Sequence, residues 1–274
     1  MQKTNYITNK ELLKEIHNSK VSYCSYLEPR YADYDAIVFS TSDINEELIE
    51  KVIEKKSKPR TRGVPKNAPV TPPTREDLVF RVMTDEHIPL DPTRKRKAKD
   101  KGDGPMPART NFPPFKHYAF IDGDLREVCR SHWRGTIAEG EFSQEHGKMT
   151  RRLADMFMLL VQRYALRGNF RGYTYNDEMQ SLALLQLSQV GLYFNEAKGD
   201  NPFAFYTTAI RNCFVRVLLV ERKAQSFRDD LLIAAGQTPS FTRQIESEIE
   251  QRAAWEAAHK AVPVPGVRAK TART

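Results

Sequence analysis

The sequence has 274 residues, of which 16 are proline and 28% are charged, and its formal net charge is +8. A chain of this length has room for one or two domains, at roughly 100–200 residues per domain. No stretch reaches the roughly 18 consecutive apolar residues of a membrane-spanning helix, and the opening residues lack the apolar core of a secretory signal. We therefore expect a cytoplasmic protein with no membrane partner.

The positive charge is concentrated in two short segments that contain proline and glycine. Residues 51–66 carry a net charge of +6 and residues 93–109 a net charge of +5, which leaves −3 for the rest of the chain. Such segments are typical of solubilising linkers. Contact with a nucleic acid is the alternative interpretation.

The three cysteines, Cys24, Cys129 and Cys213, are far apart and none belongs to a CxxC pair. This spacing predicts neither a disulfide framework nor a zinc knuckle. We expect all three thiols to be reduced and mostly packed in the interior.

Residues 1–56 are predicted to form an N-terminal helix and a small α/β segment. Thr8 and Glu11 have the spacing of a capping box, and apolar residues follow them at helical spacing. The β-branched and aromatic run at 34–40 predicts a strand, and the pattern at 44–56 predicts a helix.

Residues 57–115 are predicted to be a basic, proline-rich linker or insertion, partly disordered, because prolines recur too densely for long regular elements. One short strand is expected within it, at 78–83. Residues 116–145 are predicted to be a short connecting segment, beginning with a strand, a turn and a short helix.

The sequence contains no GxSxG, HExxH or P-loop motif and no GxGxxG after a strand. The best cluster of metal-capable side chains consists of His117, Asp122, Asp124, Cys129 and His132. Its spacings match no closed zinc site, and a turn followed by a capped helix explains the same residues. We predict no enzymatic activity and no cofactor.

From residue 146 to residue 236 the pattern becomes helical. One helix is indicated by a stripe at i, i+3, i+4, i+7, i+8 and i+11, made of Leu153, Met156, Phe157, Leu160, Val161 and Tyr164. Gly168 is expected to end it in the left-handed conformation. The next helix, 177–194, is apolar on more than one face and should lie among other helices. We therefore expect a mainly α protein, a helical bundle preceded by the smaller N-terminal part.

Asn201 and Pro202 are expected to cap and begin a further helix that extends to residue 223. Its buried stripe is predicted to comprise Phe203, Tyr206, Ile210, Phe214 and Val217. Phe205 falls off this stripe. Residues 237–274 are expected to form a last helix and a disordered tail.

The helix that begins at Pro202 combines aromatic and basic residues, a combination that can bind single-stranded DNA. Aromatic rings stack on unpaired bases, and cations neutralise phosphates. A buried aromatic stripe beside a solvated basic face explains the same periodicity, so the residue pattern leaves both interpretations open.

The run from residue 168 to residue 246 resembles region 2 of the sigma factors that T-even-like phages, including cyanophages, use for late transcription. The resemblance rests on YF at 193–194, FxxYxxxIRN at 203–212 and ERK at 221–223, with GNFRGYTYNDEM before them and RDDLL after them. NYITNKELLKEI near the amino terminus resembles the start of the same proteins. Residues 30–145 resemble no family.

The resemblance implies a non-enzymatic factor of the host cell cytoplasm that binds host RNA polymerase core and opens late promoters. The 177–194 helix would dock on the clamp helices of the largest subunit through Asp177, Glu178, Ser181, Leu184, Leu185 and Gln189. The following helix would hold the non-template single strand of a −10-like promoter element through Phe203, Phe205, Tyr206, Arg211, Asn212, Arg216, Arg222 and Lys223.

Two departures from that family limit what the resemblance implies. LALLQLSQ replaces the carboxylates typical of the polymerase-binding helix, so docking is expected to rest on apolar contact. The final VPVPGVRAKTART lacks an aromatic-acidic motif for the sliding clamp, which leaves the clamp, or a phage co-activator, an open question. No helix-turn-helix for a −35 element is recognisable.

Three other functions compete with a sigma factor. A polymerase-binding adaptor without DNA readout is the strongest of them. A sequence-specific DNA-binding regulator would need a recognition helix after a short turn, and the last helix is too acidic and too rich in glutamine for that role. A nucleic-acid-processing enzyme would need a catalytic cluster that the sequence does not offer.

Overall fold

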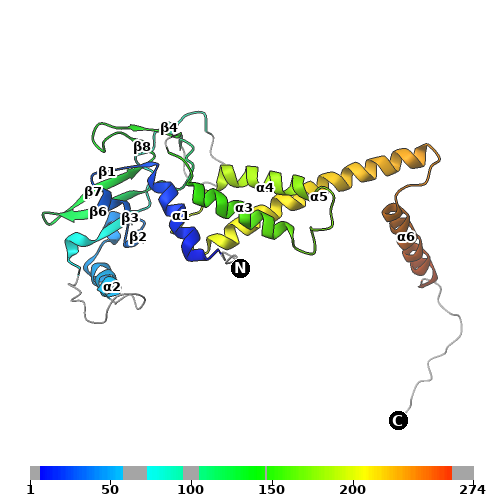
Figure 1. Ribbon diagram of the computed structural model, residues 1–274, viewed down its shortest axis with the longest axis horizontal. Coiled ribbons are helices and arrows are strands. Elements are labelled where there is room, and N and C mark those ends of the chain that lie inside the picture. Colours follow the sequence, from blue (N-terminus) through cyan, green and yellow to red (C-terminus); the bar gives the residue numbers. More distant parts are fainter. Residues whose placement is uncertain (1–6, 58–72, 95–104, 146, 261–274) are drawn as a thin grey trace, which may run out of the picture. The chain divides into compact units, whose positions relative to one another are not determined.

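The computed structural model describes residues 7–57, 73–94, 105–145 and 147–260 (Figure 1). Of these residues, 52% are helical and 14% lie in strands. The prediction of a mainly α protein is therefore wrong, because the N-terminal part forms a five-stranded mixed sheet. The chain divides into two compact units, Met1–Phe214 and Val215–Thr274, and each is described by itself. Most of the two basic segments and the tail after residue 260 lie outside the described residues.

The sheet has the strand order β1-β7-β6-β3-β2. Its strands are β1 (Cys24–Tyr26), β2 (Ala36–Val38), β3 (Val79–Val82), β6 (Lys116–Ile121) and β7 (Asp124–Ser131). Neighbouring strands are antiparallel except for β2 and β3, which are parallel. The strands predicted at 34–40 and 78–83 are confirmed as β2 and β3.

The β6–β7 hairpin turns at Asp122 and Gly123, which have φ angles of 55° and 86°. A two-residue turn with positive φ at both positions matches the twist of the flanking strands, and Asp-Gly is one of its preferred sequences. The short helix predicted after this turn is wrong, because the turn directs the chain back along β6 as β7.

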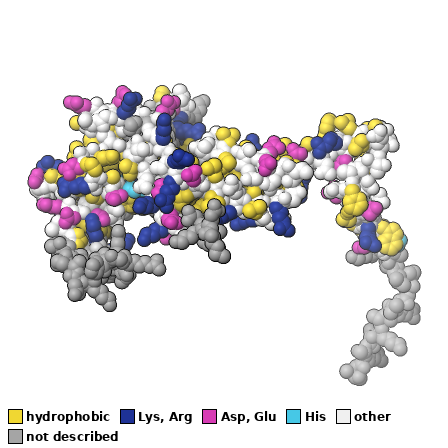
Figure 2. All heavy atoms as spheres, viewed as in Figure 1, with side chains coloured by type: hydrophobic (Ala, Val, Ile, Leu, Met, Phe, Trp, Pro, Cys, Tyr) yellow, Lys and Arg dark blue, Asp and Glu magenta, His cyan; other side chains and the backbone are white. Residues whose placement is uncertain are grey.

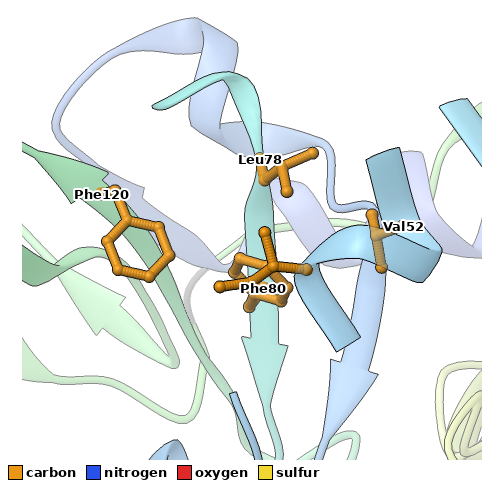
Figure 3. Close-up of a cluster of buried hydrophobic side chains, with 5 residues drawn as sticks. Val52, Leu78, Phe80 and Phe120 are labelled. Carbon is orange, nitrogen blue, oxygen red and sulfur yellow. The ribbon is translucent and has the colours of Figure 1, made fainter. Parts of the chain in front are cut away.

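The helix α2 (Glu46–Ser57) supplies residues to the core on one face of the sheet and confirms the helix predicted at 44–56. Five buried side chains form this core: Ile49, Val52, Leu78, Phe80 and Phe120 (Figure 3). The rings of Phe80 and Phe120 meet edge to face, 6.3 Å apart between centroids. Burial of each ring contributes about 1.5–3 kcal/mol to stability.

A second cluster of buried side chains contains Tyr31, Val79, Ala119 and Val128. Successive side chains of a strand point to opposite faces, so Val79 and Arg81 of β3 share the face away from Phe80. This second face therefore also bears the buried side chain of Arg81.

Shorter elements complete the described part. They are the 3-10 turns η1 (Pro29–Ala32), η2 (Thr41–Asp43) and η3 (Arg75–Asp77), and the strands β4 (Leu90–Asp91), β5 (Met106–Pro107), β8 (Trp133–Arg134) and β9 (Glu141–Phe142). β4 pairs with β5 and β8 with β9. The prediction of a single strand between residues 57 and 115 is wrong, since β3, β4 and β5 all lie there.

Four helices carry the rest of the first unit: α1 (Asn9–Val21), α3 (Arg151–Ala165), α4 (Asn176–Val190) and the start of α5 (Pro202–Ala234). The capping box of α1 is confirmed, because the Thr8 hydroxyl accepts the Glu11 N–H at 3.2 Å and the Glu11 carboxylate accepts the Thr8 N–H at 3.2 Å. α1 joins α3 through Thr150, whose N–H donates to the Ser19 hydroxyl at 3.1 Å.

All six side chains of the predicted α3 stripe are buried, so that helix is confirmed. Its ending differs from the prediction. α3 ends at Ala165 with Leu166 as a right-handed C-cap, and Gly168 does not have a positive φ angle.

In the second unit α5 continues to Ala234, beyond the predicted end at residue 223. A turn with Gly236 at φ 72° leads to α6 (Phe241–Lys260). The Asp229 carboxylate accepts the N–H and the hydroxyl of Ser240 at 2.8 and 2.7 Å, which ties the two helices together. Hydrophobic side chains lie on the surface of this unit (Figure 2), among them Leu219, Val220, Phe227, Leu231, Phe241, Ile249 and Trp255.

Candidate functional site

The helix α4 has a buried face and an exposed face. Met179, Ala183 and Leu187 are buried at intervals of four residues, which places them on one side of the helix, and α4 packs against α3. The exposed side therefore carries the residues that a partner protein can reach.

Five of the six side chains predicted to bind polymerase are exposed on α4: Asp177, Glu178, Ser181, Leu185 and Gln189. Leu184 is half-buried, which makes it a poor contact. Leu185 is 57% exposed and is the large apolar side chain at the middle of this face. A single exposed apolar side chain is normal on a protein surface, so Leu185 offers an accessible apolar contact but does not by itself mark a docking site.

The amino-terminal end of the exposed face is acidic. Asp177 and Glu178 lie in the first turn of α4, where the positive end of the helix dipole stabilises carboxylates. The Ser181 hydroxyl donates to the Asp177 carbonyl at 2.9 Å. The face thus offers negative charge at one end and an apolar contact one to two turns later.

A groove of about 370 Å³ opens at the carboxyl-terminal end of α4. Gln189, Tyr193 and Lys148 are among the residues that line it. Gln189 lines this groove and also lies on the exposed face of α4, so the groove continues that face.

The helix α5 begins as predicted. Asn201 caps it, with its side-chain oxygen accepting the Ala204 N–H at 3.1 Å, and Pro202 occupies the first position. A second cap comes from α1, where the Asn9 side-chain oxygen accepts the Phe203 N–H at 3.2 Å. The first turn of α5 is therefore held from two elements.

Three aromatic side chains of this turn have different environments. Phe203 and Phe205 are 39% and 37% exposed, whereas Tyr206 is fully buried and donates its hydroxyl to the Gly191 carbonyl. Burial raises the pKa of Tyr206 far above its ordinary value. The prediction that Phe203 is buried is wrong, and Tyr206, predicted as a DNA contact, is a core residue instead.

Phe194 is the aromatic residue for which the sequence pattern predicted no role. It follows α4 in the YF motif, is buried, and packs edge-on against Phe205 with 5.7 Å between ring centroids. The signal that could have found it was the YF pair at 193–194, which follows α4 a few residues before the Asn201 cap. Phe205 thus rests on one buried ring of the preceding loop.

The other five residues predicted to contact DNA are all exposed. Arg211 and Asn212 lie in the first unit, and Arg216, Arg222 and Lys223 lie on the part of α5 that belongs to the second. By helical periodicity, Asn212 shares a face with Phe205. The exposed cations Arg216, Arg222 and Lys223 belong to the second unit, and such side chains are suited to phosphates.

The candidate metal residues do not meet. His117 and Cys129 pair across β6 and β7, but Asp122 and Asp124 lie at the exposed hairpin turn and His132 stacks on Phe112. The described residues contain no group of three metal-capable side chains. All three cysteines lie among these residues and none forms a disulfide.

Within the described residues, α5 is the one helix with the length and composition to cross a bilayer. Tyr206, Ile210 and Phe214 of that helix are fully buried in protein, and Arg211 and Arg216 interrupt its apolar sequence. One helix of this kind is weak evidence for a membrane span, and 28% of its apolar window is buried.

The geometry therefore supplies an exposed face on α4 and two half-exposed phenylalanines at the start of α5. Buried contacts within the first unit hold α4 against α3 and the Phe205 ring against Phe194. Comparison with family models, with curated proteins and with solved structures finds no match to this chain.

Proposed function

We propose that this protein is a sigma-type initiation factor that binds host RNA polymerase core and opens phage late promoters. In this proposal the exposed face of α4 docks on the clamp helices of the largest subunit. The start of α5 holds the unpaired non-template strand of a −10-like element. The polymerase supplies the chemistry, and the protein acts by binding the open state better than the closed state.

One observation carries the proposal: Phe203 and Phe205 remain more than one-third exposed beside a fully buried Tyr206. Phe203 and Phe205 lie two positions apart and therefore point to different sides of the helix, and each ring offers a separate face on which one base can stack. Each stacked base is stabilised by roughly 1–3 kcal/mol. Unstacking costs a few kcal/mol per base, so two such contacts together with phosphate neutralisation are large enough to offset it.

The two surfaces differ in chemistry, which supports separate partners. The α4 face has carboxylates and Leu185 and no basic residue among its predicted contacts, whereas Arg211 and Arg216 follow the exposed rings of α5. Negative charge on α4 disfavours DNA and suits a basic protein surface. Positive charge on α5 suits phosphate.

A reconstituted run-off assay tests the proposal. Host core polymerase, the full chain and a linear template with a TATAAATA-like late promoter are expected to give a run-off product that depends on both proteins. A template with the promoter element scrambled is the control. Equal transcription from both templates contradicts promoter recognition, and copurification with core but no promoter-dependent product indicates an adaptor without DNA readout.

A further inference from the structure

Three charged side chains are buried where the sheet meets the helices of the first unit. Lys20 of α1 is 1% exposed and Arg81 of β3 is 0% exposed. The Glu196 side chain, in the loop between α4 and α5, is 9% exposed. These residues come from three distant parts of the sequence, and none lies on the exposed face of α4 or on α5.

Lys20 holds the loop that precedes α5. Its ammonium group donates to the Phe194 carbonyl oxygen at 2.6 Å and to the Glu196 carboxylate at 2.7 Å. Phe194 is the residue whose ring packs against Phe205. A single side chain of α1 is thus bonded to the backbone of the residue that supports the exposed ring.

Arg81 connects the same carboxylate to the sheet. Its guanidinium lies between the rings of Tyr34 and Phe115, 3.8 and 3.9 Å from their centroids, and its Nε donates to His117 at 2.9 Å. Its Nη1 lies 3.9 Å from the Glu196 carboxylate. Stacking on two faces and a hydrogen bond along the edge leave the guanidinium one orientation.

Electrostatics keep the cluster charged. Burial opposes ionisation of Glu196, but the charges of Lys20 and Arg81 hold its pKa below the ordinary value. Burial lowers the pKa of Lys20 to about 8, against the opposing effect of Glu196. Glu196 is the carboxylate that faces both buried cations, so removing it leaves Lys20 and Arg81 uncompensated, whereas removing Lys20 leaves Glu196 with Arg81 alone.

Stability alone is a weak explanation for such a cluster, because well-packed apolar residues stabilise an interior at least as well as buried ion pairs do. The geometry is better explained if the cluster fixes the position of the backbone to which it is bonded. Lys20 bonds to a backbone carbonyl, and α1 also caps the Phe203 N–H through Asn9. Both bonds end on the segment that carries the exposed phenylalanines.

We propose that Lys20, Glu196 and Arg81 are positioning residues through which α1 and the sheet fix the Phe194–Phe205 pair for single-strand binding. The contacts show how these residues hold the Phe194–Phe205 pair, and the role of that pair in DNA binding rests on the proposed function. The sheet, which resembles nothing in the sigma family, thereby becomes part of the DNA-binding apparatus. Loosening the cluster moves Phe205 without altering any exposed residue.

The test uses the full chain with Lys20→Met, which keeps the length of the apolar stem and removes the donor. Hydrogen exchange of peptides that cover residues 192–205 is expected to become at least several-fold faster, while the exchange of β3 and β6 stays unchanged. The matched control is Lys56→Met. Lys56 also donates to one carboxylate and one carbonyl, those of Asp35 and Asp77, at 2.9 and 2.8 Å, but its partners lie in the sheet part.

The same variants are then measured with core polymerase and a labelled single-stranded TATAAATA oligonucleotide. Lys20→Met is expected to lower the affinity several-fold, and Lys56→Met to leave it unchanged. Unchanged exchange at 192–205, or faster exchange with unchanged affinity, overturns the proposal. If the wild-type complex binds no oligonucleotide, the proposed function fails while the exchange result still decides the positioning.

A second variant separates positioning from folding. Lys20→Met with Glu196→Gln leaves the buried Arg81 without its carboxylate, so it is expected to unfold at a lower denaturant concentration than Lys20→Met alone. The bond to the Phe194 carbonyl is missing in both variants. Equally fast exchange at 192–205 in the two variants supports positioning, and exchange that becomes faster still with the further loss of stability shows that Lys20 acts only through stability.

Discussion

The ring of Phe205 stands edge-on to the buried ring of Phe194 at an interplanar angle of 64°, and meets Tyr206 on another side at 79°. Two buried aromatic neighbours leave Phe205 little rotational freedom while part of its surface remains open to solvent. A ring fixed in this way loses little conformational entropy when a base stacks on it. The pair is therefore better suited to base stacking than an isolated surface phenylalanine.

Phe205→Ala is expected to weaken single-strand binding by roughly 1–3 kcal/mol, the usual contribution of one stacked base. Oligonucleotide affinity measured in the presence of core polymerase checks this value. The loss should persist on a template with a premelted bubble, since a bubble removes the unpairing cost but not the need to hold the exposed base. Phe227→Ala, which removes an exposed phenylalanine farther along α5, is the control and should leave affinity unchanged.

Leu185→Asp is expected to weaken the pull-down of core polymerase. The substitution places a charge at the exposed apolar position of α4, where a docked partner would have to desolvate it. Met158→Asp on α3 is the matched control, because Met158 is also an exposed apolar residue of a helix in the same unit. Equal binding of the folded Leu185 variant and wild type would exclude α4 as the docking surface.

Arg216→Ala is expected to flatten the salt dependence of single-strand binding. Loss of one phosphate contact reduces the slope of log affinity against log salt concentration by about 0.7. Arg252→Ala, which removes an exposed arginine from α6, should leave the slope unchanged. A slope that stays the same in both variants would show that Arg216 makes no phosphate contact.

Local sequence signals predicted the helical part well. The Thr8–Glu11 capping box, the α3 stripe and the Asn201–Pro202 start of α5 all depend on residues a few positions apart, and all three are confirmed. The prediction that Phe203 is buried failed, because the buried stripe of α5 starts one turn later, at Tyr206. Periodicity places a residue on a face and cannot show where along the helix its cover begins.

The sheet was harder to predict because its pairings are not local. β3 and β6 are neighbours in the sheet but are separated by more than thirty residues that contain several prolines. The Asp122–Gly123 hairpin had a usable signal, and reading its carboxylates as helix caps concealed it. The bond from Lys20 to Glu196 spans 176 positions and has no local signature. A function for the cluster of Lys20, Glu196 and Arg81 can therefore be proposed only from the structure.

The buried His132 and the half-buried His87 make stability depend on pH. His132 is fully buried against Phe112, 4.0 Å between ring centroids, and burial, reinforced by the charges of His87 and Lys20, lowers its pKa to about 3. Burial likewise lowers the pKa of His87 to about 4. In the unfolded chain a histidine titrates near 6.5, so protons bind the unfolded state first as the pH falls.

The contribution of neutral His132 to the free energy of unfolding is therefore complete above a pH of about 6.5, and it declines as the pH falls toward about 3. The decline is expected to be at most about 1.4 kcal/mol per pH unit for this residue. His132→Asn should reduce that slope in urea unfolding series, because asparagine does not titrate and tolerates the positive φ of 52° at this position. His259→Asn, at an exposed histidine of α6, is the control and should leave the slope unchanged. An unaltered slope in the His132 variant would mean that this imidazole does not govern the acid sensitivity. The decline would then come from other groups whose pKa is lowered in the folded protein, among them His87, His117 and Glu196.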